Sequence, residues 1–308
     1  MLQYVEIGLS AVLAEADADL PPFLGTTLRG AFGLLFKRTV CQARHGRCVQ
    51  CGVRTVCPYP AVFEGLAPEG RQIMRRYDTI PQPFVLLVPS PGQRWGLPGE
   101  LVWGFRLFGA ACRFWPYVVH TFDAAGKAGI GRGRWKYTIQ CVTDGIGGNT
   151  LWTPGCSDWA EPAQRHIDHC ASTVPPHCTL RWRFETPLRL RSSGMVRDEQ
   201  INPMDLLLNG RRRFSIMRHF YDADGSELPP DERLDAGRFR IISEQVFPWA
   251  HRRYSLRQKR RMVLGGLLGE MVIEGPWGLS GPWLNAVPIL HLGKATTFGF
   301  GNVKWEML

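Results

Sequence analysis

The chain has 308 residues, of which 44% are apolar and 21% charged, so it can bury two ordinary cores of about 150 residues each. This composition excludes a disordered chain, and no run approaches the ~18 uncharged apolar residues of a membrane span. Lys and Arg number 37 against 27 Asp and Glu, a net charge of +10 that indicates a polyanionic partner. The first residues show no secretory signal, so we expect a soluble, cytoplasmic protein.

The first half of the chain has the pattern of a strand, a helix, two strands, a helix and a strand. Residues 5–13 alternate apolar and polar side chains, as a half-buried strand does. Thr26 can cap a helix with one apolar side, formed by Leu28, Phe32, Leu35 and Phe36. The next elements are two apolar strands, an apolar helix and a last strand, over residues 84–88, 101–107, 108–122 and 134–142.

The second half repeats this order. Its predicted elements are a strand, a helix, two strands, a short helix and a last strand, over residues 179–185, 204–220, 238–247, 264–273, 283–291 and 302–307. The order β-α-β-β-α-β is that of a ferredoxin-like fold.

A glycine-rich loop precedes the last strand of each half. Both loops begin Gly-Lys-Ala, at residues 126 and 293, which indicates an internal duplication. We therefore predict an α+β protein of two tandem ferredoxin-like domains, over residues 1–148 and 179–308, with a connection over 149–178.

A cysteine-rich loop, residues 41–57, interrupts the first predicted domain. Its pattern is Cys41-x6-Cys48-x2-Cys51-x5-Cys57, in which the x2 spacing is typical of zinc sites. Four thiolates would close a structural zinc site and leave no open position for catalysis. An iron–sulfur cluster, unligated thiols, or His45 in place of one thiolate remain alternatives. A second Cys/His group within 156–178 is too irregular in spacing to assign to a metal.

The glycine-rich loops and basic strips indicate where phosphates would bind. Glycines let backbone amides approach a phosphate, and Lys294 or Arg132 would add charge beside them. Neither loop matches the nucleotide-binding P-loop pattern, and a simple tight turn is the alternative. Aromatic residues that could stack on bases lie among the arginines. The basic residues form three clusters along the chain. They are Arg132, Arg134 and Lys136; Arg211 to Arg213; and Arg252, Arg253, Arg257, Lys259, Arg260 and Arg261.

RNA cleavage by this chain would not require a metal ion. The substrate's 2′-hydroxyl can attack the adjacent phosphorus, given a base, a proton donor and cations at the phosphate. His45 is the first candidate base, in a loop flanked by Arg38 and other arginines, and His251 is the second. If no histidine serves, arginines could stabilise the phosphorane while Tyr254 or water moves the proton.

Several collinear motifs resemble the CRISPR-associated RAMP proteins, specifically the endoribonucleases that process precursor CRISPR RNA. The motifs are Leu28-Arg29-Gly30-Ala31-Phe32-Gly33, the cysteine loop ending in Cys57-Pro58-Tyr59-Pro60, Gly129-x-Gly-Arg-Gly-Arg134, the strip from Arg253 to Met262, Gly265 to Gly269, and Gly293 to Gly301. They cover nearly the whole chain apart from the 145–178 segment.

The resemblance implies tandem ferredoxin-like (RAMP- or RRM-like) domains, binding of repeat RNA, and metal-independent cleavage that leaves a 2′,3′-cyclic phosphate. It also implies retention of the processed RNA for a multi-subunit effector complex. His45 lies where family members often place a catalytic histidine, although its position inside a cysteine loop departs from the family. The residues it marks as RNA contacts are Arg29, Lys294, Thr296, Thr297, Gly299 and Gly301.

Two other functions fit the same residues. One is a RAMP subunit without nuclease activity that holds guide RNA in an effector complex. The other is a zinc-containing nucleic-acid-binding module of another pathway.

Overall fold

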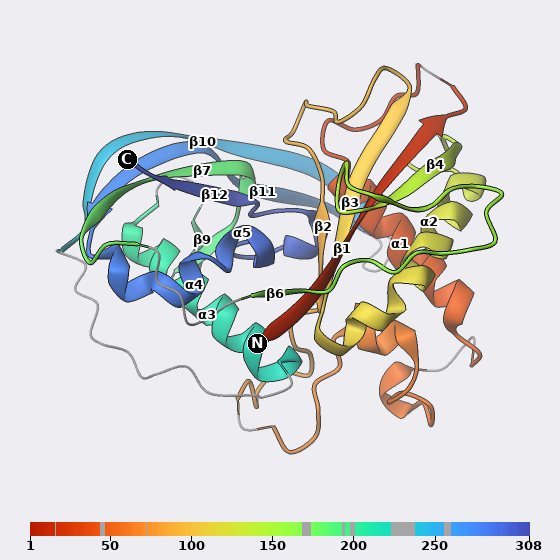
Figure 1. Cartoon of the computed structure of the whole chain (residues 1–308), viewed down its shortest axis with the longest axis horizontal. Helices are drawn as coiled ribbons and strands as arrows, with labels where there is room; N and C mark the ends of the chain where they lie inside the picture. The colour runs from red at the N-terminus through yellow and green to blue at the C-terminus, as the bar shows by residue number, and fades with distance from the viewer. Residues whose placement is uncertain are drawn as a thin grey trace. The chain divides into compact units, whose positions relative to one another are not determined.

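The computed structural model describes residues 1–15, 17–43, 47–71, 73–167, 174–192, 195–197, 201–222, 238–255 and 260–308. Its contacts divide the chain into two compact units, each with its own sheet and helices (Figure 1). The N-terminal unit comprises Gln3–Val88 and Gln93–Arg165. The C-terminal unit comprises His166–Leu308 together with Met1–Leu2 and Pro89–Gly92. None of the described helices has the length and apolar character that crossing a membrane would need.

The N-terminal unit is built on a six-stranded sheet. Its strands are β1 (Leu2–Leu13), β2 (Phe84–Leu87), β3 (Glu100–Phe108), β4 (Tyr137–Asp144), β5 (Thr150–Trp152) and β6 (Arg165–Ile167). Its helices are α1 (Gly25–Val40), the 3-10 helix η1 (Cys48–Gln50), the π-helix η2 (Pro60–Glu64), the 3-10 helix η3 (Gly109–Phe114) and α2 (Trp115–Ala128). The strand order is β2-β3-β1-β4-β5, and β6 pairs with β1. Strands β5 and β6 lie in the predicted connection, and β6 begins at Arg165, the last residue of this unit.

The core of this unit is an aromatic cluster centred on Phe32 of α1. The Phe32 ring lies 4.9 Å from the rings of both Phe36 and Phe105, and 5.5 Å from that of Phe122 on α2. The odd-numbered residues of β1 from Val5 to Leu13 are buried, as the predicted period-two pattern requires.

Two predicted helix starts in this unit are wrong. Helix α1 begins at Gly25, and Thr26 is a buried helical residue that does not cap it. The buried side chains of Phe23 and Leu24 fix this start instead. Helix α2 begins at Trp115, because Pro116 fits only the first turn of an α-helix, and a 3-10 helix precedes it.

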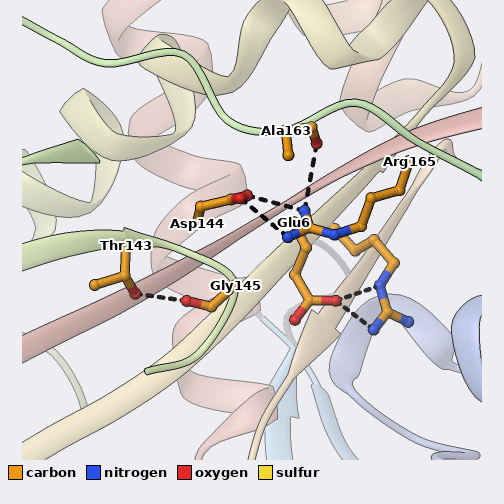
Figure 2. A network of polar contacts seen from close by, with 7 residues as sticks. Glu6, Thr143, Asp144, Gly145, Ala163 and Arg165 are labelled. Carbon is orange, nitrogen blue, oxygen red and sulfur yellow. Dashed lines mark hydrogen bonds and ion pairs between the residues drawn. The ribbon is translucent and has the colours of Figure 1, made fainter. Parts of the chain in front are cut away.

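A polar network joins Glu6 of β1 to β3 and to the end of β4 (Figure 2). Glu6 on β1 accepts a hydrogen bond from Nε of its cross-strand partner Arg106, at 2.8 Å. Asp144 at the end of β4 accepts two hydrogen bonds from the guanidinium of Arg165, at 2.9 and 3.0 Å. The backbone N–H of Gly145 donates to the carbonyl oxygen of Glu6, at 2.8 Å. These bonds join strands that lie far apart in the sequence.

Replacing Arg165 with glutamine should lower the free energy of unfolding by about 1–2 kcal/mol, because it leaves the mostly buried Asp144 carboxylate unpaired. Urea denaturation measures the change. Lys127→Gln, which removes an exposed pair with Asp123 within α2, is the control and should cost about 0.5 kcal/mol or less. Equal losses in the two variants would contradict a structural role for the Arg165 pair.

The C-terminal unit has a four-stranded sheet in the order β10-β11-β7-β12 and a small two-stranded sheet, β8-β9. Its strands are β7 (Cys178–Leu188), β8 (Leu190–Ser192), β9 (Met195–Arg197), β10 (Arg240–Ser255), β11 (Arg260–Gly275) and β12 (Val303–Met307). Its helices are α3 (Pro203–Tyr221), η5 (Trp277–Ser280), α4 (Gly281–Leu284), α5 (Val287–Leu290) and η6 (Thr296–Phe298). Asn202 caps α3 by accepting a hydrogen bond from the Met204 N–H at 2.9 Å.

Two predicted elements of this unit differ from the structure. The predicted helix over 283–291 is instead two single turns, α4 and α5, and Pro288 lies in the first turn of α5, where proline is tolerated. The hairpin of β10 and β11 extends farther than predicted, up to Ser255 and Arg260.

One face of this sheet carries paired charges. Glu306 on β12 accepts hydrogen bonds from Arg181 and Arg183 of β7, at 2.8 and 3.0 Å. Arg183 also lies 3.6 Å from Glu270, and Lys304 lies 4.0 Å from Glu185. Trp182, between the two arginines, is fully buried on the opposite face. The paired face is close to neutral and leaves little net charge for a polyanion.

Candidate nucleic-acid interface

The glycine-rich loop before β12 has a backbone shape that glycine permits. Gly299 and Gly301 have positive φ, 83° and 68°, and so does Ala295, at 64°. A Cβ atom on Gly301 would collide with the backbone oxygen of Leu292, so only glycine fits there. The loop is therefore a fixed backbone platform and not merely a connection.

The rest of the C-terminal unit holds this loop in place. The Thr186 hydroxyl on β7 donates to the carbonyl oxygen of Gly299 at 2.6 Å and accepts from the Asn302 N–H at 2.9 Å. Nδ1 of the buried His291 lies 3.0 Å from the carbonyl oxygen of Phe300. The Lys294 N–H donates to the carbonyl oxygen of Arg189 at 2.8 Å. These contacts preorganise the loop before any ligand arrives.

Four cations gather at the loop: Lys294 belongs to it, and Arg191, Arg212 and Arg213 interact electrostatically with Lys294. Nη2 of Arg213, from α3, donates to Oγ1 of Thr296 at 3.2 Å and to the carbonyl oxygen of Leu290 at 3.3 Å. Burial lowers the pKa of Arg213 to about 10, so it stays charged at neutral pH. Partial burial, and then the positive charges of Arg212, Arg191 and Arg213, lower the pKa of Lys294. The other three cations therefore destabilise the Lys294 charge, and a bound anion would relieve this repulsion.

The long β10-β11 hairpin adjoins the same loop. Trp249 on β10 stacks on His251, with ring centroids 5.8 Å apart, and meets the Phe300 ring of the loop edge-on at 6.2 Å. Strand β7 pairs with β11 only from Leu267 onward, so the distal part of the hairpin extends beyond β7. The predicted basic residues at this distal end are Arg252, which is exposed, and Arg253, Arg260 and Arg261, of which the structure describes only the backbone. Arg257 and Lys259 lie outside the described residues.

The glycine-rich loop of the N-terminal unit has a different form. It is a tight turn, closed by two backbone hydrogen bonds of 2.9 Å between Ile130 and Trp135. Gly131 and Arg134 have positive φ, and this turn delays the start of β4 to Tyr137. The basic side chains predicted to contact RNA here, Arg132, Arg134 and Lys136, are all exposed.

The predicted catalytic residues belong to both units, and part of them lies outside the described residues. Arg38 is exposed in the last turn of α1, in the N-terminal unit. Tyr254 lies on β10, in the C-terminal unit, and only its backbone is described. His45 lies outside the described residues. Arg29 packs over the Phe63 ring at 4.3 Å, which gives it a structural contact.

The four cysteines of the 41–57 loop are all partly exposed. Within the part of the chain that the structure describes, no three His, Cys, Asp or Glu side chains are arranged to hold a metal ion. Burial raises the pKa of the Cys48 thiol, and the neighbouring Lys37 opposes this. His169 and Cys170, from the second Cys/His group, lie outside the described residues.

Two family models match the chain, one over its N-terminal part and one over its C-terminal part. The family described as the AF_1859_N N-terminal domain matches residues 2–166. The family of the CRISPR-associated endoribonuclease Cas6 matches residues 182–303. The first match covers more than half of the chain, which therefore belongs to the family of the AF_1859_N N-terminal domain, and the C-terminal part is similar to the CRISPR-associated endoribonuclease Cas6.

Relatives of the chain are distant. An uncharacterised protein of Archaeoglobus fulgidus is 29% identical over 144 residues, which cover 47% of this chain and 48% of that protein. The chain thus matches about half the length of this curated relative.

Solved Cas6 structures share the fold over the whole chain. The product complex of the Cas6 TTHB231, a protein of Thermus thermophilus, has a TM-score of 0.53 at 14% identity and covers 99% of this chain and 100% of its own. The product complex of the Cas6 TTHA0078 has a TM-score of 0.51 at 16% identity, with 98% and 99% coverage. A Cas6-RT-Cas1–Cas2 complex has a TM-score of 0.52 at 9% identity and covers all of this chain and 29% of that chain.

Sequence reasoning missed several residues of this interface. The arginines of 211–213 were visible as a basic group, but nothing in the sequence placed them at the glycine-rich loop. Arg189, Arg191 and Thr186 gave no pattern at all. Of the loop residues predicted to touch RNA, Thr296 and Thr297 are buried, and Thr296 accepts a hydrogen bond from Arg213, whereas the Lys294 side chain is exposed.

Proposed function

We propose that the chain binds CRISPR repeat RNA and cleaves precursor CRISPR RNA. The observation that carries this proposal is the braced loop 293–301, with Lys294, Arg191, Arg212 and Arg213 around it. The match of residues 182–303 to the family model of the endoribonuclease Cas6 supports it. A rigid backbone loop surrounded by cations suits the phosphates of an RNA chain.

The proposed cleavage is an attack by the RNA's own 2′-hydroxyl on the adjacent phosphorus. It breaks the bond to the 5′-oxygen, leaves a 2′,3′-cyclic phosphate and uses no metal ion. The cations at the loop would stabilise the negative charge of the phosphorane. His251 is a candidate base besides His45, because its stacking on Trp249 holds it beside the loop. Tyr254, three residues further along β10, stays a candidate proton carrier.

We assign the RNA to the loop and the hairpin of the C-terminal unit, and not to the face of its sheet. RNA-binding sheets of the RRM type present aromatic residues on the exposed face. The face that carries Arg181 and Arg183 has its arginines paired with Glu306. It therefore offers RNA less attraction than the loop does.

Both units are proposed to be ferredoxin-like domains. The four strands of the βαββαβ pattern are ordered β4-β1-β3-β2 in the N-terminal unit and β12-β7-β11-β10 in the C-terminal unit. When each set is numbered along the chain, both orders read 4-1-3-2, with antiparallel neighbours. This shared order supports the duplication that the two Gly-Lys-Ala loops indicate.

After cleavage, the chain would keep its product and deliver it to other CRISPR proteins. The same preorganised loop that binds the substrate would retain the processed RNA. The alternative is a subunit that holds guide RNA without cutting it, since both functions need the same fold and charge.

Full-length protein incubated with its repeat RNA should cleave it equally well with and without EDTA. A single 2′-deoxy substitution at the scissile nucleotide should abolish cleavage and leave binding intact, because the attacking group is removed. Denaturing gels and filter binding measure the two properties. Cleavage that requires a divalent ion, or that survives the 2′-deoxy substitution, would contradict the mechanism. Binding without any cleavage would favour the non-catalytic alternative.

A further inference from the structure

In the loop between α1 and η2, the cysteine side chains are more buried than most of the other side chains. Among the described residues from 41 to 57, only the four cysteines and Arg54 are half-buried, and the rest are exposed. Val49, Val53 and Val56 have exposed fractions of 58%, 52% and 69%. This loop buries its thiols in preference to its apolar side chains, so hydrophobic burial does not account for its shape.

Two of the cysteines stand at the fixed ends of the loop. Cys41 ends α1, and its N–H donates to the carbonyl oxygen of Lys37 at 2.9 Å. Cys57 lies just before η2, whose flanking Tyr59 meets the Phe36 ring of α1 at 5.9 Å. Phe63 of η2 packs 5.9 Å from Phe32 in the same way. The buried aromatic core therefore holds the chain segments that carry Cys41 and Cys57.

The other two cysteines share one tight turn. Cys48 begins the 3-10 helix η1, and the Cys51 N–H donates to the Cys48 carbonyl oxygen at 3.2 Å. A Cys-x2-Cys turn of this kind directs two thiols toward one ion. Two further backbone turns lead from this turn to Cys57: the Arg54 N–H donates to the Cys51 carbonyl oxygen at 3.1 Å, and the Cys57 N–H donates to the Val53 carbonyl oxygen at 3.0 Å.

We propose that Cys41, Cys48, Cys51 and Cys57 bind one structural Zn²⁺ ion. The four thiols would lose their protons and form four Zn–S bonds of about 2.3 Å in a tetrahedron. The described side chains are not yet arranged to hold the ion, so binding would draw the thiols together. An exposed loop with so few buried side chains can make this adjustment at small cost. A closed four-thiolate site has no open position, so the ion would fasten the loop to α1 and η2 and take no part in catalysis.

Metal analysis of the full-length protein, purified under reducing conditions, tests this proposal. The wild type should contain about one zinc ion per chain, and the double variant Cys48→Ser/Cys51→Ser should contain about tenfold less or lower. Cys156→Ser is the matched control, because Cys156 is an exposed free thiol outside the loop. It should keep the wild-type content. In the wild type, Co²⁺ substitution should give the thiolate-to-cobalt charge-transfer absorption, which does not depend on RNA or on activity.

Equal zinc content in the double variant and in Cys156→Ser would overturn the proposal. Iron with labile sulfide in place of zinc would overturn it as well. If the double variant is insoluble, the cobalt spectrum of the wild type decides: thiolate absorption at about one equivalent of metal supports the site, and its absence refutes it.

Discussion

Replacing Lys294, Arg191 and Arg212 together with glutamine should weaken binding of repeat RNA by about 100-fold at physiological salt. Lys294 is part of the glycine-rich loop. The positive charges of Arg191 and Arg212 contribute to the lowered pKa of Lys294. Each lost phosphate contact means that fewer counterions are released when RNA binds. For single-stranded RNA, the slope of log K against log salt concentration should therefore become shallower by about 0.7 per lost contact. Filter binding over a range of salt concentrations measures both effects.

The sheet face of the same unit supplies a matched control. Arg181→Gln with Arg183→Gln removes two positive charges that are already paired with Glu306. This variant should bind RNA within about threefold of the wild type, because exposed ion pairs contribute little to a distant ligand. If both variants lose affinity equally, net charge and not the loop determines binding, and the proposed interface is wrong.

Replacing Gly301 with alanine should lower the free energy of unfolding by about 3 kcal/mol. Two penalties add: the positive φ of 68° disfavours any residue with a Cβ, and the new atom would overlap the Leu292 backbone. Leu292 cannot retreat easily, because its N–H donates to the Gly301 carbonyl oxygen at 2.8 Å. Urea denaturation measures the loss, and RNA affinity should fall with it as the loop distorts.

Gly70→Ala separates these two penalties. Gly70 has a φ of 71°, almost the same as that of Gly301, but a Cβ there meets no atom within 4 Å. It should cost about 1 kcal/mol, the conformational penalty alone. A similar loss in both variants would show that the tight fit of the loop against Leu292 contributes nothing.

The strands and the longer helices could be predicted from the sequence because their patterns are local. Period-two alternation marked β1 and β7, and helical spacing marked α3, each within a few residues of its observed bounds. The ends of helices were less predictable. The start of α1 depends on Phe23 and Leu24 packing into the core, and no local capping signal reports such packing.

The candidate site was predictable only in part, for the same reason. The glycines of 293–301 are visible as a motif, but the contacts that shape the loop come from distant residues. Thr186, which binds Gly299, is 113 residues away in the sequence, and Arg213 is 83 residues from Thr296. Neither gives a spacing pattern, because a sheet and a helix bring them to the loop only after folding. The spacing of Cys48 and Cys51 is a motif in itself, so that hypothesis needed no tertiary contact.

The position of β10 at the edge of its sheet also affects how the protein behaves at high concentration. An edge strand has unpaired backbone groups, and Ile241, Ile242 and Phe247 on β10 are exposed, with exposed fractions of 40%, 49% and 55%. Such a strand favours pairing with another copy of itself, which leads to aggregation. The basic residues at the distal end of the hairpin, of which Arg252 is exposed, should oppose this by charge repulsion between copies. We therefore expect these basic residues to limit self-association of the protein, in addition to the RNA contact proposed for them.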